Sequence, residues 1–197
     1  MQKRIIGLLL IVFLASCAMP ETKIYSLNMP NPPSPPLSKG GMGGFSDATV
    51  AVLVSSPRYL TQPYIAYRTS PYQLAISRYA KWDSPPDEMV RDAFKDTLSP
   101  GLFKDVRTSS FVPAGSYSLK INLKRFERSD EGDLSFAEVA FDVSLLSPEG
   151  KNLYQNSVTK KIRLEDRSFL SLARSLSSAL GEGTEEVRGN IAKALKQ

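Results

Sequence analysis

Two long stretches in the second half of the chain alternate apolar and polar residues. The first runs from Tyr117 to Lys124 and the second from Ala137 to Leu145, with turn-forming residues at 129–132 between them. A further turn at 148–151 leads into a third extended segment, residues 154–164. A period of two is typical of strands with one buried face. We therefore predict three antiparallel strands that follow one another as a meander.

Two other segments have the spacing of amphipathic helices. One follows Ser84 and a pair of prolines and ends at the Ser-Pro-Gly of residues 99–101. Serine caps helices, and proline tolerates the first turn because its missing amide would be unpaired there. The other runs from Phe169 to Leu195, and we expect a kink or a break at Gly181 to Gly183.

Shorter extended segments come before the first helix, at residues 23–27, 49–54, 64–68 and 72–79. The sequence TVAVLV at 49–54 is a nearly continuous β-branched run, which predicts a central strand covered on both faces. Residues 30–45 are rich in proline and then in glycine, and such a composition buries too little apolar surface to fold. We expect this stretch to be a disordered insertion.

The first seventeen residues indicate a compartment. A basic start is followed by an apolar run at residues 5–14, which is too short to span a bilayer and is typical of a secretory signal peptide. Leu14, Ala15, Ser16 and Cys17 then resemble a bacterial lipobox, and Cys17 is the only cysteine of the chain. We predict that the mature protein begins at Cys17 and carries a diacylglycerol and an acyl group there. Each buried methylene contributes about 0.8 kcal/mol, so these chains would hold the protein on a membrane.

These patterns predict an α+β fold: a single mixed, largely antiparallel sheet with two main helices packed on one face, preceded by a lipoprotein signal peptide. We divide the chain into a signal peptide (1–16), a tether with a short strand and a Pro/Gly-rich linker (17–47), and a globular domain (48–197). Ala18 follows the cysteine, and the absence of an aspartate at that position favours the outer membrane over the inner one.

Composition excludes several kinds of site. The chain has 25 Lys and Arg against 20 Asp and Glu, a formal charge of +5, which is too mild and too dispersed for a nucleic-acid partner. It has no histidine and one cysteine, which rules out intramolecular disulfides, His/Cys zinc sites and catalysis by Ser-His-Asp or Cys-His groups. The acidic stretch Asp130 to Asp133 lacks the ligand spacing of a calcium loop, so we predict a turn and no metal.

A resemblance to a known family adds to this interpretation. The lipobox is followed by a Tyr-Ser-Leu strand, then by Pro57-x-Tyr59-Leu60, a strand that ends at Arg68, Trp82 just before the proline-led helix, and a C-terminal Ala/Leu/Ser-rich helix. In this order and spacing the features resemble the ABC-type transport auxiliary lipoproteins, the PqiC-like family. This chain departs from the family at Thr61 and Gln62, where many members carry a charged pair.

The resemblance implies a non-enzymatic protein without cofactors. Such lipoproteins act with an ABC transporter whose periplasmic component is an MCE-domain protein, in lipid trafficking between membranes. The chain would be tethered to the periplasmic face of the outer membrane, and a homo-oligomer is a further option. Two alternatives stay open: a generic envelope scaffold or assembly factor, and a hydrolase that uses paired carboxylates.

The candidate partner interface consists of Tyr59, Leu60, Arg68 and Trp82. For Trp82 we favour a place in the core at the junction of helix and sheet over an interface anchor. For Arg68 a solvated charge at a strand end is the commoner role. A set of basic residues could line one solvent-exposed face of the sheet, which would suit anionic lipid headgroups: Lys120, Lys124, Arg125, Arg128, Lys160, Lys161 and Arg163.

Overall fold

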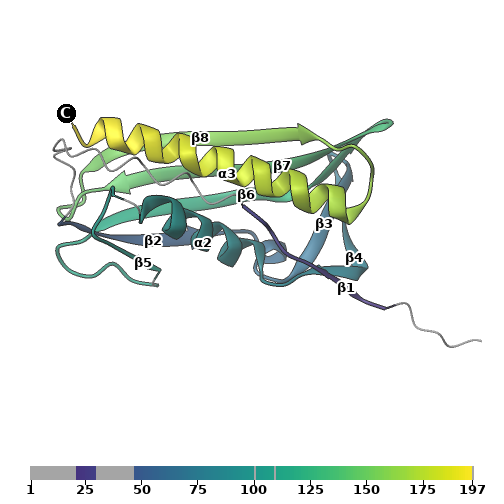
Figure 1. Cartoon of the computed structure of the whole chain (residues 1–197), viewed down its shortest axis with the longest axis horizontal. Coiled ribbons are helices and arrows are strands. Elements are labelled where there is room, and N and C mark those ends of the chain that lie inside the picture. The colour runs from purple at the N-terminus through teal and green to yellow at the C-terminus, as the bar shows by residue number, and fades with distance from the viewer. Residues whose placement is uncertain (1–20, 30–46, 100, 109, 197) are drawn as a thin grey trace, which may run out of the picture.

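The described part of the chain forms an eight-stranded mixed sheet with two helices on one of its faces (Figure 1). This computed structural model describes residues 21–29, 47–99, 101–108 and 110–196. The strands are β1 (Lys23–Tyr25), β2 (Thr49–Ser55), β3 (Tyr64–Ser70), β4 (Gln73–Trp82), β5 (Asp105–Thr108), β6 (Tyr117–Glu131), β7 (Leu134–Leu146) and β8 (Asn152–Arg163). The helices are α2 (Pro86–Leu98) and α3 (Phe169–Ala194), and a 3₁₀ turn, η1 (Arg58–Leu60), joins β2 to β3. The predicted α+β class is confirmed.

Strand β6 organises the sheet. It pairs along its whole length with β7, which pairs with β8, so the predicted antiparallel meander is confirmed. On its other edge β6 pairs in parallel first with β2 and then, near its end, with β3. The strand continues through residues predicted to be a turn, and the hairpin closes with Gly132 at a φ of 61°. Glycine adopts this conformation without the strain that a Cβ would add.

A β-bulge in β6 changes which residues face the helices. Leu123 pairs with Phe141 and Arg125 with Ala140, so Lys124 is one extra residue on β6. A bulge of this kind reverses the alternation of the strand that carries it. Before the bulge Leu123 faces the core, and after it Phe126 does so. The even-numbered residues therefore become the inner ones in the second half of β6.

The core lies between the sheet and the two helices. The Phe94 ring of α2 meets the Phe141 ring of β7 edge to face, with centroids 5.5 Å apart. Helix α3 runs along β7 and β8 (Figure 1), and the Thr97 and Thr184 hydroxyls form a hydrogen bond of 3.1 Å where α2 meets α3. Strong burial of both helices on one side explains why their apolar spacing was visible in the sequence.

Several local predictions were wrong. Helix α3 continues through Gly181 and Gly183 without a break, and α2 begins after Pro85, with no side-chain cap from Ser84. The first half of β2 is buried on both faces, as predicted, since Val50, Ala51 and Val52 are fully buried, but in its second half Leu53 and Ser55 line a surface hollow. The short strand β5 was not predicted. No helix among the described residues has the length and apolar character needed to cross a membrane.

Candidate functional site

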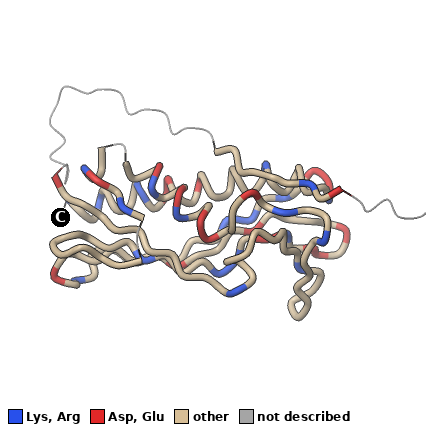
Figure 2. Tube along the Cα trace, turned by 90° about the horizontal axis from the view of Figure 1, so that it is seen from below, with Lys and Arg blue, Asp and Glu red and all other residues tan. Residues whose placement is uncertain are grey.

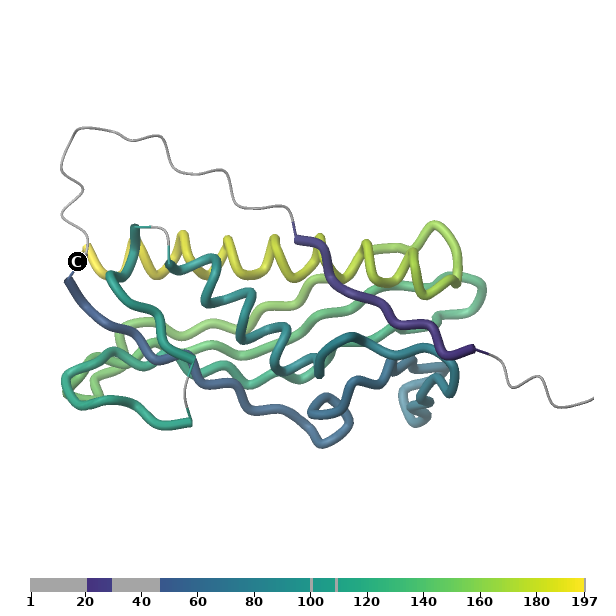
Figure 3. Tube along the Cα trace, turned by 60° about the horizontal axis from the view of Figure 1, so that its bottom comes forward, coloured from purple at the N-terminus to yellow at the C-terminus, as the bar shows by residue number. Residues whose placement is uncertain are grey.

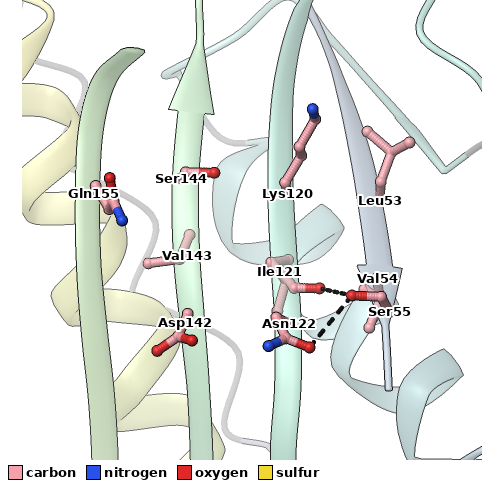
Figure 4. Close-up of a pocket in the computed structure, with 10 residues that line it drawn as sticks. All are labelled: Leu53, Val54, Ser55, Lys120, Ile121, Asn122, Asp142, Val143, Ser144 and Gln155. Atoms are coloured by element: carbon pink, nitrogen blue, oxygen red, sulfur yellow. Dashed lines mark hydrogen bonds between the residues drawn. The ribbon is translucent and has the colours of Figure 1, made fainter. Parts of the chain in front are cut away.

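The helix-free face of the sheet carries a shallow hollow of about 360 Å³ between β2, β6, β7 and β8 (Figure 4). Its lining mixes polar side chains with apolar ones, among them the buried core residues Ile121 and Val143. Its residues are Leu53, Val54, Ser55, Lys120, Ile121, Asn122, Asp142, Val143, Ser144 and Gln155. The Ser55 hydroxyl donates across the β2–β6 boundary to the Ile121 carbonyl oxygen and to Asn122 Oδ1, each at 3.4 Å.

Asp142 is the acidic group of this hollow. Its Oδ1 accepts hydrogen bonds from Lys124 Nζ and from the Ser157 hydroxyl, both at 2.6 Å. The Lys124 contact and then the Ser157 contact hold the pKa of the Asp142 carboxyl below its usual value. Asp142 is thus an ionised, satisfied carboxylate in water, which is unsuited to act as a general acid.

A second polar cluster lies beside the hollow and is centred on Glu127. The Glu127 side chain is fully buried, and its Oε1 accepts a hydrogen bond of 2.8 Å from Arg68 Nε. The Tyr59 hydroxyl lies 3.0 Å from Glu127 Oε2 and 3.3 Å from the Lys124 carbonyl oxygen. Burial, and after it the neighbouring Glu127, raises the pKa of the Tyr59 phenol, so this group stays protonated as a donor.

The topology explains why this cluster exists. β2 stops pairing with β6 at Asn122, and β3 begins to pair at Arg128, which leaves the edge of β6 uncovered in between. The turn η1 fills the gap, and the Tyr59 hydroxyl meets the Lys124 carbonyl oxygen there. Tyr59, Arg68 and Glu127 together close a discontinuity in the sheet.

Glu127 has a second acidic neighbour. It is the cross-strand partner of Glu138 on β7, which is 7% exposed. Arg125 Nη1 donates to Glu138 Oε1 at 2.7 Å, so each carboxylate faces its own guanidinium. Paired carboxylates serve in hydrolases when their environments push their pKa values apart, for example when one lies in an apolar pocket. Here both carboxylates are compensated by arginines, which does not favour the hydrolase alternative.

The structure places Leu60 and Trp82 in the core and Tyr59 against it, whereas Arg68 pairs with the buried Glu127 and is not the solvated charge that we expected. Leu60 is fully buried, and Trp82 is 2% exposed with its ring 5.7 Å from the Phe126 ring, edge to face. The core placement that we favoured for Trp82 is confirmed. Tyr59 and Arg68 belong to the Glu127 cluster, so the chain brings these two together but separates them from Trp82. Their role in binding a partner stays a prediction.

Sequence reasoning missed Glu127 and Glu138. A charged residue in a half-exposed strand is expected to face solvent, and only the bulge at Lys124 turns Glu127 to the side where Arg68 and Tyr59 lie. The one available signal was the alternation itself, because Lys124 and Arg125 are two consecutive outward residues. Nothing in the sequence showed that this doubling was a bulge.

The basic residues do not form the single solvent-exposed face that we expected. Arg128 lies on the helix side, where its guanidinium is 4.8 Å from the Tyr67 ring centroid and its Nη1 donates to the Arg167 carbonyl oxygen. Lys160 likewise points to α3 and pairs with Glu186 at 2.8 Å. Ion pairs of Lys124 with Asp142, of Arg125 with Glu138 and of Lys161 with Glu131 neutralise much of the remaining charge.

The predicted lipidation site, the Pro/Gly-rich stretch and the acidic turn are not part of the hollow or of the Glu127 cluster. Cys17, the lipobox residues Leu14 to Ser16, and the stretch 30–45 all lie outside the described residues, so lipidation stays a prediction. Asp130 belongs to β6, where it accepts from Ser135 and Arg128. No group of His, Cys, Asp and Glu within the described ranges has the arrangement of a metal site.

Comparison with known proteins decides the family. A model of the ABC-type transport auxiliary lipoprotein component matches residues 25–188. The chain belongs to this family. It is therefore an auxiliary lipoprotein component of ABC-type transport, as the resemblance implied. No curated protein matches the sequence.

Solved structures share the fold of this auxiliary lipoprotein. A crystal structure from Xanthomonas campestris has 22% identity and a TM-score of 0.72, and the match covers 89% of this chain and 98% of that one. A second crystal structure, of an uncharacterised protein, has 16% identity and a TM-score of 0.68 over 87% and 99% of the two chains. A hypothetical protein of Chlamydia trachomatis is more distant, with 8% identity and a TM-score of 0.51 over 76% and 98%.

Proposed function

We propose that this auxiliary lipoprotein is an outer-membrane-anchored, periplasmic subunit of an ABC transporter whose periplasmic component is an MCE-domain protein, and that it serves lipid trafficking and envelope integrity. The acyl groups on Cys17 hold it at the membrane, and the folded domain docks the MCE assembly or completes its conduit. The hydrolysis of ATP belongs to another subunit. The match of the transport auxiliary family over residues 25–188 is the observation that carries this proposal.

The chemistry of the helix-free face supports a binding role. Its acidic groups are held by cations, as Asp142 is by Lys124 and Glu127 is by Arg68. A satisfied and rigid polar surface suits protein docking, because no charge has to be reorganised when a partner arrives. The cluster at Glu127 fixes the relative position of β3 and β6, and it thereby shapes the surface beside the hollow.

Crosslinking in intact envelopes tests the proposal. The acylated full chain, carrying a C-terminal affinity tag, is crosslinked, purified in detergent and analysed for its neighbours by mass spectrometry. We expect an MCE-domain protein among them, and we expect deletion of the gene to make the cells sensitive to detergent. Absence of both results would contradict the proposal.

The same experiment separates the alternatives. A generic scaffold would give the envelope defect but bring down other envelope proteins instead of an MCE-domain protein. A hydrolase would lose its cellular activity in a Glu138→Gln variant that folds normally, whereas a docking protein with this change would still complement the deletion. The position of Glu138 outside the hollow of Figure 4 favours the second result.

A further inference from the structure

The hairpin of β3 and β4 projects from the sheet on the side away from the helices. Figure 2 shows it as a tan loop, the colour of uncharged residues, that extends beyond the rest of the molecule, and Figure 3 shows it nearly end-on. Tyr64 pairs with Lys81 but Ala66 pairs with Ile76, so two positions along β3 correspond to five along β4. This irregularity bends the outer half of the hairpin out of the sheet.

The tip of this hairpin carries no charge and exposes aromatic and aliphatic side chains beside the polar Thr69 and Gln73. Ser70 pairs with Gln73, which leaves Pro71 and Tyr72 as a tight two-residue turn, and the Tyr72 side chain is 98% exposed. Ile76 is 42% exposed and Tyr79 is 51% exposed. No charged residue occurs between Arg68 and Arg78, and no Asp or Glu occurs between Asp47 and Asp83. Exposed apolar groups gathered on a projecting element mark an interaction site.

The charges that border the tip are all positive. Arg78 follows the uncharged stretch on β4, and Lys81 and Lys23 lie at the base, where β1 pairs with β4. Arg68 precedes the stretch on β3, but its charge is paired with the buried Glu127. Tyrosine prefers the interface between lipid and water, and arginine and lysine favour the headgroup layer. An uncharged tip with an exposed tyrosine at its apex and cations at its base fits a bilayer surface better than it fits a protein groove, which would need complementary acidic groups.

The place of β1 puts the tip within reach of the lipid anchor. β1 runs parallel to β4, with Lys23 beside Ala80, so β1 begins at the end of the sheet that carries the hairpin (Figure 1). Lys23 is six positions after Cys17, and six residue spacings of extended chain span at most about 22 Å. Ala80 is eight positions after Tyr72, which corresponds to at most about 26 Å of strand. The two lengths are comparable, so the acylated Cys17 and the tip can meet one membrane surface together.

We propose that the β3–β4 tip, with Tyr72 at its apex, inserts into the interface of the same bilayer that holds the acyl groups, as a second membrane contact. This proposal rests on the acylation of Cys17 that the proposed function includes. The contact would orient the domain, with the hairpin and the β1 end toward the lipid. A single point of attachment would leave that orientation undefined.

An environment-sensitive fluorophore tests the insertion. Acylation consumes the only cysteine, so in the acylated full chain a Tyr72→Cys variant carries one free thiol for a nitrobenzoxadiazole label. The protein is reconstituted in vesicles of phosphatidylethanolamine and phosphatidylglycerol that contain brominated phosphatidylcholine. We expect a blue-shifted emission and a quenching by the brominated lipid that is several-fold greater than in the control.

The control is a Lys151→Cys variant, labelled in the same way. Lys151 is exposed and lies in the turn between β7 and β8, at the opposite end of the sheet from β1 (Figure 1). Fluorescence of Trp82, the sole tryptophan, reports that both variants are folded, because this side chain is 2% exposed in the core.

Flotation and the mass of the protein identify which idea fails. If the acylated protein floats with the vesicles while both labels stay equally aqueous, the insertion is wrong and the anchor stands. If the label at position 72 leaves water only when an envelope protein partner is added, the tip is a protein contact and the insertion is again wrong. If the purified protein carries no acyl group, the proposed lipid anchor and the proposed shared membrane contact are both wrong.

Discussion

At the scale of single residues, Glu127 is the most completely buried charged side chain among the ion pairs of the described residues. It is fully buried and satisfies two partners that come from different strands and turns, Arg68 and Tyr59. Removing one member of a buried ion pair destabilises a protein by more than the intact pair stabilises it, because the remaining charge is left buried without a counter-charge.

We expect Glu127→Gln to lower the free energy of unfolding by about 1–3 kcal/mol, since the guanidinium of Arg68, which is 21% exposed, loses its counter-charge. Urea unfolding followed by Trp82 fluorescence measures the change. The matched control is Glu131→Gln on the same strand, whose pair with Lys161 is largely exposed; we expect it to change stability by less than about 0.5 kcal/mol. Equal effects of the two changes would contradict a structural role for Glu127.

The Tyr59 phenol makes a prediction about pH. Its pKa is raised in the folded protein, chiefly by burial, so the folded state keeps this proton where the unfolded state loses it. The stability from this difference is complete below the unfolded pKa of about 10 and is lost as pH rises above it. Urea unfolding between neutral and alkaline pH should show a steeper fall for the native chain than for Tyr59→Phe. Parallel curves for the two proteins would show that Tyr59 does not titrate with folding.

At the scale of elements, helix α3 shows how one residue sets the distance between two layers. A Cβ on Gly183 would lie 3.4 Å from the Phe141 ring and 3.5 Å from Val158 Cγ1, whereas one on Gly181 would meet nothing within 4 Å. Gly183 lets α3 approach β7 and β8, and Gly181 has no such contact.

The two glycines form a matched pair for a test of packing. Gly183→Leu should destabilise the protein by about 1–3 kcal/mol, because the added side chain overpacks the layer between α3 and the sheet. Gly181→Leu should be neutral or stabilise by up to about 1 kcal/mol, because leucine is the better helix former. Thermal or urea unfolding compares them. A larger loss at Gly181 than at Gly183 would mean that the helix does not lie as described.

Elements with a regular period were predictable, and irregular ones were not. The helix α2 and the meander of β6, β7 and β8 repeat one buried face over many residues, so their spacing was visible. β5 has four residues and gains its place from pairing with β2, which no local pattern encodes. The bulge at Lys124 is also a tertiary feature. The position of Glu127 and the distribution of the basic residues of β6 over two faces of the sheet depend on this bulge, so neither could be predicted from the sequence.

At the scale of the whole molecule, the domain is a rigid sheet with different properties on its surfaces. The helices cover one face, a satisfied polar surface occupies the other, and the β3–β4 hairpin projects from that second face (Figure 2). Among the described residues, the buried core is formed by side chains from Val50 to Ile191, and Tyr25, Leu27 and Met29 pack against it. We expect Cys17 to serve attachment without serving the fold.

This separation can be tested by exchanging the leader. A chain whose residues 1–16 are replaced by an ordinary secretory leader, and which carries Cys17→Ser, should reach the periplasm in soluble form with its unfolding midpoint unchanged, because the core is retained. It should fail to restore detergent resistance to a deletion strain, because the docking domain no longer sits at the membrane. The control keeps Cys17 behind its native leader and should be recovered in the membrane fraction and complement. Full complementation by the soluble variant would show that attachment is dispensable, and transport would then depend on the domain alone.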